Sequence, residues 1–287
     1  MNSTYTLTEM KGLRKRRRGV YQAGIYMGVA ILILVVIFPF LWLLQMSIRP
    51  TADIFAFPPK LVFKPTFEHY MALRVGEFPR SFLNSAVSAA TSTLLSLVIG
   101  VPAAYALSRG DFRTERHIGL WVLATRMAPP IAFSIPFFLA YRYLGMVDTL
   151  LGLIIIYLTF NLSLVIWMMR IFFDSVPRAL EEAAWIDGGS IWGTFFRITL
   201  PLSAPGLAAT AIFCFLFSWN DFFYALILTR TQAMTAPVAV VNFMQYEGWE
   251  WGKIAAGGTM VMLPVVVFSL IVRNYLVRGL TAGAIKG

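Results

Sequence analysis

The stretch LEEAAWIDGGSIWGTFFRITLP, from Leu180 to Pro201, is a long run of polar and small residues in an otherwise apolar part of the chain. The residues that precede it, up to Met169, and those that follow it, from Ala204, are apolar enough to cross a membrane. A loop of this length between two spans lies at a membrane surface. Its composition indicates that something outside the chain contacts it.

The first half of this loop is expected to form a short helix. Asp174 or Ser175 can cap its start, and Glu181 and Glu182 lie early enough to suit the positive end of its dipole. The pair Gly188–Gly189 is expected to end it, because glycine accepts the left-handed conformation common at helix ends.

A second short helix is predicted after the glycines, with Ser190 as its cap and Pro201 as its end. The sequence therefore predicts two short helices across a turn. The small side chains of Ala183 and Ala184 leave a shallow surface that a partner could approach closely.

The composition places the chain in a membrane. Of its 287 residues 58% are hydrophobic and 13% are charged, whereas a soluble domain carries about 25% charged residues. With one cysteine and two histidines, the chain can form no internal disulfide and offers little for a metal site or a catalytic triad. We therefore expect no metal site and no catalytic residues.

Segments of about 20 apolar residues can span the hydrocarbon core. The sequence predicts an all-α membrane protein with six transmembrane helices in one membrane domain, 21–276, which includes the loop 174–201. A basic segment, 1–20, precedes this domain and a tail, 277–287, follows it. The expected spans are Gly24–Met46, Phe82–Leu107, Ile118–Ala140, Leu150–Met169, Ala204–Leu228 and Ile254–Val272.

Lys and Arg residues predict the orientation, because they are enriched in cytoplasmic segments. With the N-terminus inside, the inner segments hold about twice as many of them as the outer ones. This places both termini and the Leu180–Pro201 loop in the cytoplasm. Membrane topology also explains the net charge of +10, so we expect no nucleic-acid partner.

Small residues crowd the second span, and prolines lie in or near several others. Small residues allow helices to approach closely in lipid, and the carbonyls that prolines free need neighbouring groups or cavity water. These features favour a helix bundle with an internal path. Tight packing of a membrane scaffold is the alternative.

The loop also carries a specific spacing, E-A-A-x3-G-x9-I-x-L-P. It is met by seven positions, whose chance match is rarer than roughly one in 10⁵ at average residue usage: Glu182, Ala183, Ala184, Gly188, Ile198, Leu200 and Pro201. This spacing resembles the signature loop of permease subunits of binding-protein-dependent ABC importers.

The resemblance extends along nearly the whole chain and is strongest to sugar importers, in particular the second permease of maltose-type transporters. It covers RPTADIFAFPPKLVFKPTFEHYMAL (49–73), FLNSAVSAA (82–90), PAAYALSR (102–109), SWNDF (218–222) and VRGLTAGAIKG (277–287). TRMAPPIAFSIPFFL (125–139) resembles permeases for polyols and related sugars.

The resemblance implies that the loop docks in a cleft of an ATPase subunit. Glu182 is then expected to reach the ATPase, Ala183, Ala184 and Gly188 to shape the contact, and Asp187 to cap or hydrogen-bond within the loop. Gly189 departs from the alanine usual in the family. The tail 277–287 resembles tails that reach into the ATPase dimer; a frayed terminus is the alternative.

The same resemblance implies the partners: a second permease subunit, two ATP-binding subunits, an extracytoplasmic solute-binding protein and membrane lipid. The sequence contains no G-x-x-x-x-G-K-[ST] loop, so ATP and Mg²⁺ are expected on the partner subunits. We expect a multi-pass protein of a bacterial cytoplasmic membrane, which is not itself an enzyme and holds no cofactor.

Four residues are candidates for the substrate path. Trp219, Asn220 and Asp221 combine an apolar face with amide and carboxylate groups, which suits sugars or polyols. Arg126 is a charge within the third span, where charges are costly and often functional. The alternatives are that Asp221 pairs with a neighbouring helix or with Arg126, that Trp219 marks an interface, and that Arg126 snorkels or binds freed carbonyls.

Two rival functions stay open at this point. A secondary transporter driven by a proton or sodium gradient would need titratable groups along the path, where only Asp221 and Arg126 are clearly intramembrane. An ABC permease for glycerol-phosphate would share the same motifs. The sugar or polyol itself is not specified.

Overall fold

The computed structural model describes residues 7–58, 60, 62–110, 115–127, 129–245 and 248–284. Within them the fold is helical, apart from two paired two-residue strands. The elements are α1 (Leu7–Ser47), α2 (Thr51–Ile54), α3 (Glu68–Leu73), α4 (Phe78–Arg109), α5 (Glu115–Met127), α6 (Pro130–Tyr143), α7 (Leu150–Ser175), α8 (Arg178–Ile186), α9 (Ile191–Thr194), the π-helix η1 (Phe195–Thr199), α10 (Leu200–Leu202), α11 (Ala204–Trp219), α12 (Phe223–Leu228), α13 (Ala236–Val241), β1 (Met244–Gln245), β2 (Gly248–Trp249) and α14 (Trp251–Ala284).

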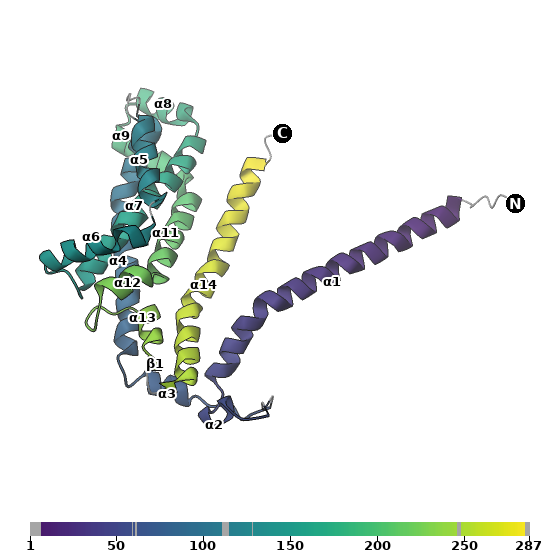
Figure 1. The fold of residues 1–287 in the computed structure, drawn as a ribbon. Helices are drawn as coiled ribbons and strands as arrows, with labels where there is room; N and C mark the ends of the chain where they lie inside the picture. Colours follow the sequence, from purple (N-terminus) through teal and green to yellow (C-terminus); the bar gives the residue numbers. More distant parts are fainter. Residues whose placement is uncertain are drawn as a thin grey trace.

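The long helices α4 and α7 form the centre of the bundle and lie side by side (Figure 1). The face of α4 toward its neighbours consists largely of small side chains, among them the buried Ser88, Ala89 and Ser92. At Gly100 a Cβ would lie 2.7 Å from Cγ1 of Val165 on α7. The expected close approach of the second span to its neighbours is therefore confirmed, because only small residues permit this spacing.

Two predicted spans are not continuous helices. The third is broken between α5 and α6, which meet at 91°; Pro129 has extended backbone angles there and precedes α6. The expected fifth span, Ala204–Leu228, ends as a helix at Trp219, and α12 follows as a separate helix. The prediction of single helices was therefore wrong in both places, because local prolines and polar groups interrupt the apolar runs.

Four described helices are long and apolar enough to cross a membrane, or up to six if each of two bent pairs is one span. The second pair joins 191–202 to 204–219 at 77°. The all-α membrane fold is confirmed, with six crossings as the upper count.

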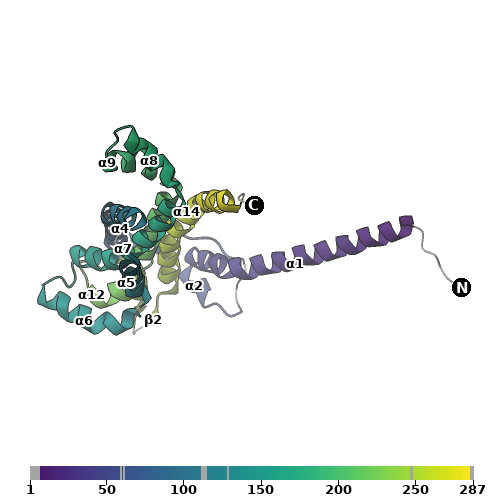
Figure 2. The same cartoon turned by 90° about the horizontal axis from the view of Figure 1, so that it is seen from above.

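Helix α1 projects away from the rest of the molecule in both views (Figures 1 and 2). Its apolar side chains between Tyr21 and Leu41 are exposed. Near its C-terminal end Leu43 lies against α14, 3.5 Å from the position that a Cβ on Gly258 would take. Helices α2 and α3 then connect α1 to α4 at the end of the bundle opposite α8 and α9 (Figure 1).

Asp148, between α6 and α7, forms hydrogen bonds with the backbone of the segment after α12. Its carboxylate accepts backbone hydrogen bonds from Arg230, Thr231, Gln232 and Ala233, at 2.9–3.2 Å. Burial raises the pKa of Asp148, but these four N–H donors outweigh it and lower the pKa to about 2.

Two apolar clusters organise the interior. One gathers residues of α3, α4, α6, α7, α12 and α13, such as Phe78, Ile156 and Leu228. The other joins the ends of α4 and α7 to η1 and α11 through side chains such as Tyr105, Phe173 and Phe195. The second cluster packs η1 against the bundle, and Trp192 of α9 contacts its Phe195, with ring centroids 5.9 Å apart.

Candidate coupling site

Helix α8 begins with a proline and not with a side-chain cap. Pro177 is its N-cap residue and makes no capping hydrogen bond. Ser175 instead ends α7 and donates to the Phe172 carbonyl at 2.6 Å, while Asp174 accepts from the Ser108 hydroxyl. The predicted Asp174 or Ser175 cap was therefore wrong, because Pro177 ends α7 and restricts the backbone that leads into α8.

The end of α8 agrees with the prediction. Gly188 has φ +86°, the left-handed conformation that favours glycine. The backbone N–H of Gly189 donates to the Ala184 carbonyl at 2.8 Å. A Cβ on Gly189 would lie 2.7 Å from that oxygen, so glycine permits this tight turn where alanine would crowd it.

The second helix begins as predicted but does not end at Pro201. The Ser190 hydroxyl accepts from Gly193 N–H at 3.1 Å. The chain then continues through η1 into α10, and Pro201 lies in the first turn of α10. The prediction that Pro201 ends this helix was wrong, since proline is tolerated in a first turn.

Helix α8 and the turn after it, which carry the predicted docking residues, lie at the top of Figure 1. Glu182, Ala183, Asp187 and Gly188 are exposed, and Ala184 is half-buried. Asp187 follows α8, and its backbone N–H donates to the Ala183 carbonyl at 3.0 Å. Within the described chain no hydrogen bond is recorded for its side chain, so the predicted side-chain capping role of Asp187 stays a prediction.

Large apolar side chains surround these residues, which the sequence analysis did not single out. They are Trp185, Ile186, Ile191 and Trp192, and Ile186 is 86% exposed. An exposed apolar patch of this kind is typical of a protein interaction surface. The signal was present in the sequence, because these side chains flank the glycine turn.

Beneath the exposed edge, Glu181 is buried at 1% exposure. Arg109 Nε lies 3.0 Å from both of its carboxylate oxygens, and Nη2 donates to Oε1 at 3.0 Å. Tyr105 donates to Oε2 at 3.1 Å and Thr199 to Oε1 at 2.8 Å. Burial raises the pKa of Glu181, but the hydrogen bonds from Arg109 and Thr199 and the Arg109 charge outweigh it, so the pKa is lowered.

The predicted position of Glu181 early in the helix is confirmed, since it lies in the first turn of α8. Its carboxylate also forms a buried ion pair with Arg109 of α4, which the sequence analysis did not predict. Arg109 also donates to the Val176 carbonyl at 3.0 Å, and Arg178 donates to the Ser108 carbonyl at 3.0 Å. The end of α4 is thus joined to α8, to η1 and to the segment between α7 and α8. The i, i+4 spacing of Tyr105 and Arg109 places both side chains on one face of α4, and this was the sequence signal for their shared contact with Glu181.

The three consecutive path candidates make separate contacts. Trp219 is buried and its indole donates to the Val261 carbonyl at 3.0 Å. Asn220 is exposed, and its amide donates to the Leu216 carbonyl of its own helix.

Asp221 accepts from the Tyr157 hydroxyl at 3.1 Å and from backbone N–H groups at the start of α12. These contacts agree with the alternative that Asp221 pairs with a neighbouring helix. Among the described residues no ion pair joins Asp221 to Arg126.

The Arg126 guanidinium lies over the Phe217 ring, 4.9 Å from its centroid. Its Nη1 is buried and has no hydrogen-bond partner among the residues that the structure describes. Asn161 and Asn84 form hydrogen bonds to other segments, Asn161 to Ser218. No group of three potential metal ligands occurs in the described part of the chain.

The chain belongs to the family described as binding-protein-dependent transport system inner membrane component, which matches residues 96–281. It is therefore a permease of a transport system and a multi-pass membrane protein. The match includes the loop 174–201 and Arg109, so the coupling loop lies in the family's own part of the chain.

Relatives and solved structures extend this likeness over nearly the whole chain. The trehalose transport system permease SugB of Mycobacterium tuberculosis is 38% identical over 94% of this chain and 99% of the relative. The trehalose/maltose permease MalG of Thermococcus litoralis is 35% identical over 91% of this chain and 95% of the relative. A bacterial ABC transporter for alginate superposes with TM-score 0.74 at 26% identity, covering 96% of this chain and 99% of the other.

Proposed function

We propose that this chain is a permease subunit of an ATP-driven importer that moves a carbohydrate across the cytoplasmic membrane. The importer would contain a second permease, two ATP-binding subunits and an extracytoplasmic binding protein. Relatives at 31–38% identity include permeases for trehalose, trehalose/maltose and diacetylchitobiose. A permease for sulfoquinovosyl glycerol is 32% identical over 91% of this chain. These relatives of nearly full coverage support a carbohydrate or glycoside as cargo.

The observation that supports the coupling role is the different environment of the two neighbouring residues Glu181 and Glu182. Glu182 is exposed for a partner, while Glu181 is buried against Arg109. A force on α8 would therefore reach α4 through an ion pair. Closure of the ATPase dimer would carry α8 and α9 inward and tilt the long helices as rigid bodies.

The orientation follows from the charge distribution. We place α8, α9 and both termini in the cytoplasm and α2 and α3 outside, because Lys and Arg are enriched in the segments on the α8 side. ATP and Mg²⁺ would be held by the partner subunits. Of the tail 277–287, residues 277–284 continue helix α14 and 285–287 lie outside the described residues. The path of this tail into the ATPase dimer stays a prediction.

The path candidates narrow to Arg126 and Asn220. The contacts of Trp219 and Asp221 favour packing and helix capping, whereas Asn220 is exposed and Arg126 keeps an unused donor. The unused donor is also the observation that favours the second candidate cargo, a glycerol-phosphate, since a guanidinium binds phosphate well.

The coupling proposal is tested with Glu182→Ala in the reconstituted complex. Uptake driven by ATP should fall strongly while the complex still assembles. Glu77→Ala is the matched control, because Glu77 is exposed at the opposite end of the bundle. Unimpaired ATP-driven uptake by Glu182→Ala would contradict the proposal, and uptake without ATP but with an ion gradient would support a secondary transporter.

A further inference from the structure

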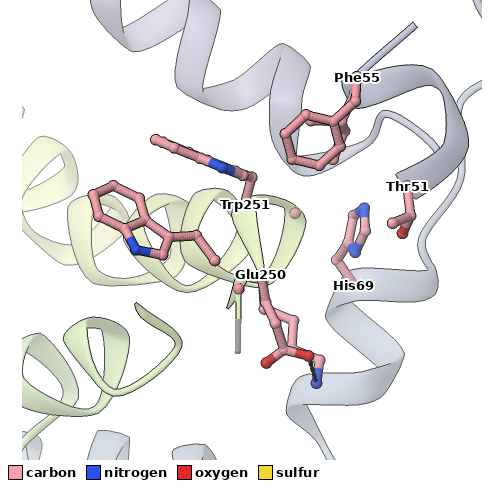
Figure 3. A pocket seen from close by; sticks show the side chains of 10 residues that line it. Thr51, Phe55, His69, Glu250 and Trp251 are labelled. Atoms are coloured by element: carbon pink, nitrogen blue, oxygen red, sulfur yellow. Dashed lines mark hydrogen bonds and ion pairs between the residues drawn. The ribbon is translucent and has the colours of Figure 1, made fainter. Parts of the chain in front are cut away.

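A pocket of about 350 Å³ lies between α2, α3 and the start of α14 (Figure 3). It is at the end of the molecule opposite α8, far from the coupling site (Figure 1). Its volume is in the range of small-molecule sites, roughly 300–1,000 Å³. None of the functional residues discussed above lines it.

Aromatic rings form much of its wall. The rings of Trp249 and Trp251 lie 4.9 Å apart between centroids, at 42° to each other. Phe55 lies across from Trp251 on the α2 side (Figure 3). Trp249 is 51% and Phe55 69% exposed, so flat apolar faces are available to a ligand.

The lining also contains polar side chains, among them one acid and one base, Glu250 and Lys253. Glu250 and Lys253 form an ion pair at 2.6 Å, and each keeps further hydrogen-bonding capacity. The buried His69 donates from Nε2 to the Arg49 carbonyl at 2.8 Å. A Cβ on Gly252 would collide with the His69 ring, so glycine lets the floor of the pocket form.

A ligand for this pocket needs an apolar face for the rings and hydroxyl groups for Glu250 and Lys253. It needs no net charge, because the pocket's acid and base already neutralise each other. A pyranose ring has these properties: its axial C–H groups form an apolar face, and its edge carries hydroxyls. A charged ligand would find no unpaired opposite charge here, because Glu250 and Lys253 are paired with each other.

We propose that this pocket is a saccharide subsite that holds a neutral pyranose ring of the cargo on the outer side, before the cargo enters the path. The proposal rests on the carbohydrate function and on the outer placement of α2 and α3. It adds a place where the permease itself touches the sugar. A loop of the binding protein is the other possible occupant, and the experiments separate the two.

The first experiment measures sugar binding directly. The complete permease–ATPase complex in lipid nanodiscs, without binding protein, is titrated with trehalose and methyl α-glucopyranoside, and saturation-transfer NMR reports ring contacts. We expect transfer in the wild type, loss in Trp251→Ala, and recovery in Trp251→Phe. Phe57→Ala is the matched control, because Phe57 is 96% exposed in the same region and does not line the pocket. Equal transfer in Trp251→Ala and the control would overturn the proposal.

The second experiment measures uptake and ATPase activity in proteoliposomes with sugar-loaded binding protein. Trp249→Ala and Trp251→Ala each remove one stacking face and should reduce uptake about fivefold. The concentration of binding protein that gives half-maximal ATPase activity should stay unchanged. A parallel rise in that concentration would assign the pocket to the binding protein and overturn the proposal. If the wild type imports no sugar at all, the carbohydrate function itself fails. If the wild type imports sugar and both variants do so equally well, only the subsite fails.

Discussion

Arg109 on α4 contacts both carboxylate oxygens of Glu181 on α8 through its Nε, at 3.0 Å, and its side chain is 9% exposed against 1% for Glu181. The pair joins the helix expected to meet the ATPase to a central helix of the bundle. It lies directly behind Glu182, the residue that the sequence marked. The pair thus provides the physical link between the docking surface and the membrane helices.

Glu181→Ala should leave the Arg109 guanidinium buried without its carboxylate. Breaking a buried pair from one side costs about 3 kcal/mol, so the melting temperature of the purified complex should fall. Differential scanning fluorimetry measures this change. Glu182→Ala is the internal control and should keep the wild-type melting temperature while losing coupled uptake, because Glu182 is exposed. Equal melting temperatures for the two variants would show that the pair does not hold α8.

Gly188→Ala should weaken the turn after α8. Gly188 has φ +86°, and a side chain in the left-handed region costs about 1 kcal/mol. ATPase activity stimulated by binding protein should fall because the docking edge changes shape. Gly76→Ala is the control, since Gly76 has no neighbouring atom within 4 Å of a Cβ and no positive φ. Wild-type stimulation in Gly188→Ala would count against a fixed turn.

The stabilisation that the Asp148 carboxylate gives to the backbone of 230–233 should be lost at acidic pH. The folded pKa of about 2 lies below the ordinary value of 3.8, so the stabilisation is complete above pH 3.8 and is lost as the pH falls toward 2. Hydrogen exchange of the 230–233 amides at neutral pH should be faster in Asp148→Asn, which removes the charge but tolerates the φ of +58°. Thr51→Ala, at a site without contact to this loop, is the control. Unchanged exchange in Asp148→Asn would contradict the role of the carboxylate.

Arg126→Gln should separate transport from assembly. The buried Nη1 lacks a partner in the described part of the chain, so the charge is not required for a known contact other than the Phe217 ring. If Arg126 lines the path, the KM for uptake should rise severalfold while binding-protein-stimulated ATPase activity stays. Arg126→Lys, which keeps the charge, should recover part of the uptake. A loss of assembled complex in both variants would instead show a structural role.

The sequence predicted the coupling loop well because its constraints are local. Gly188 needs a left-handed backbone, and Ser190 reaches an N–H three residues away; neither depends on distant parts of the chain. The predicted caps at Asp174 or Ser175 were wrong because α8 begins only at Arg178, with Pro177 as its N-cap residue. Pro201 was read as a stop, although the chain had already begun a new turn at Leu200.

The predicted spans were right where the apolar run is the only constraint, as in α4 and α7. They were wrong before α6, where Pro129 and Pro130 interrupt the helix, and at 220–222, where the polar Asn220 and Asp221 do so. Hydropathy averages over about 20 residues and does not resolve such a break. The substrate-path candidates at 219–221 stay a prediction; they lie at a helix end, where each side chain makes different contacts.

By itself the sequence determined the class of protein, the apolar regions long enough to span a membrane and the glycine turn after α8 at Gly188. These follow from hydropathy, local turn chemistry and motif spacing, all of which act over short stretches of chain. Only the tertiary structure decided that Glu181 pairs with Arg109, 72 residues earlier, and that Trp251 and Phe55 line one pocket. Such contacts depend on how helices pack against one another, and no local rule specifies which side chains meet across that distance.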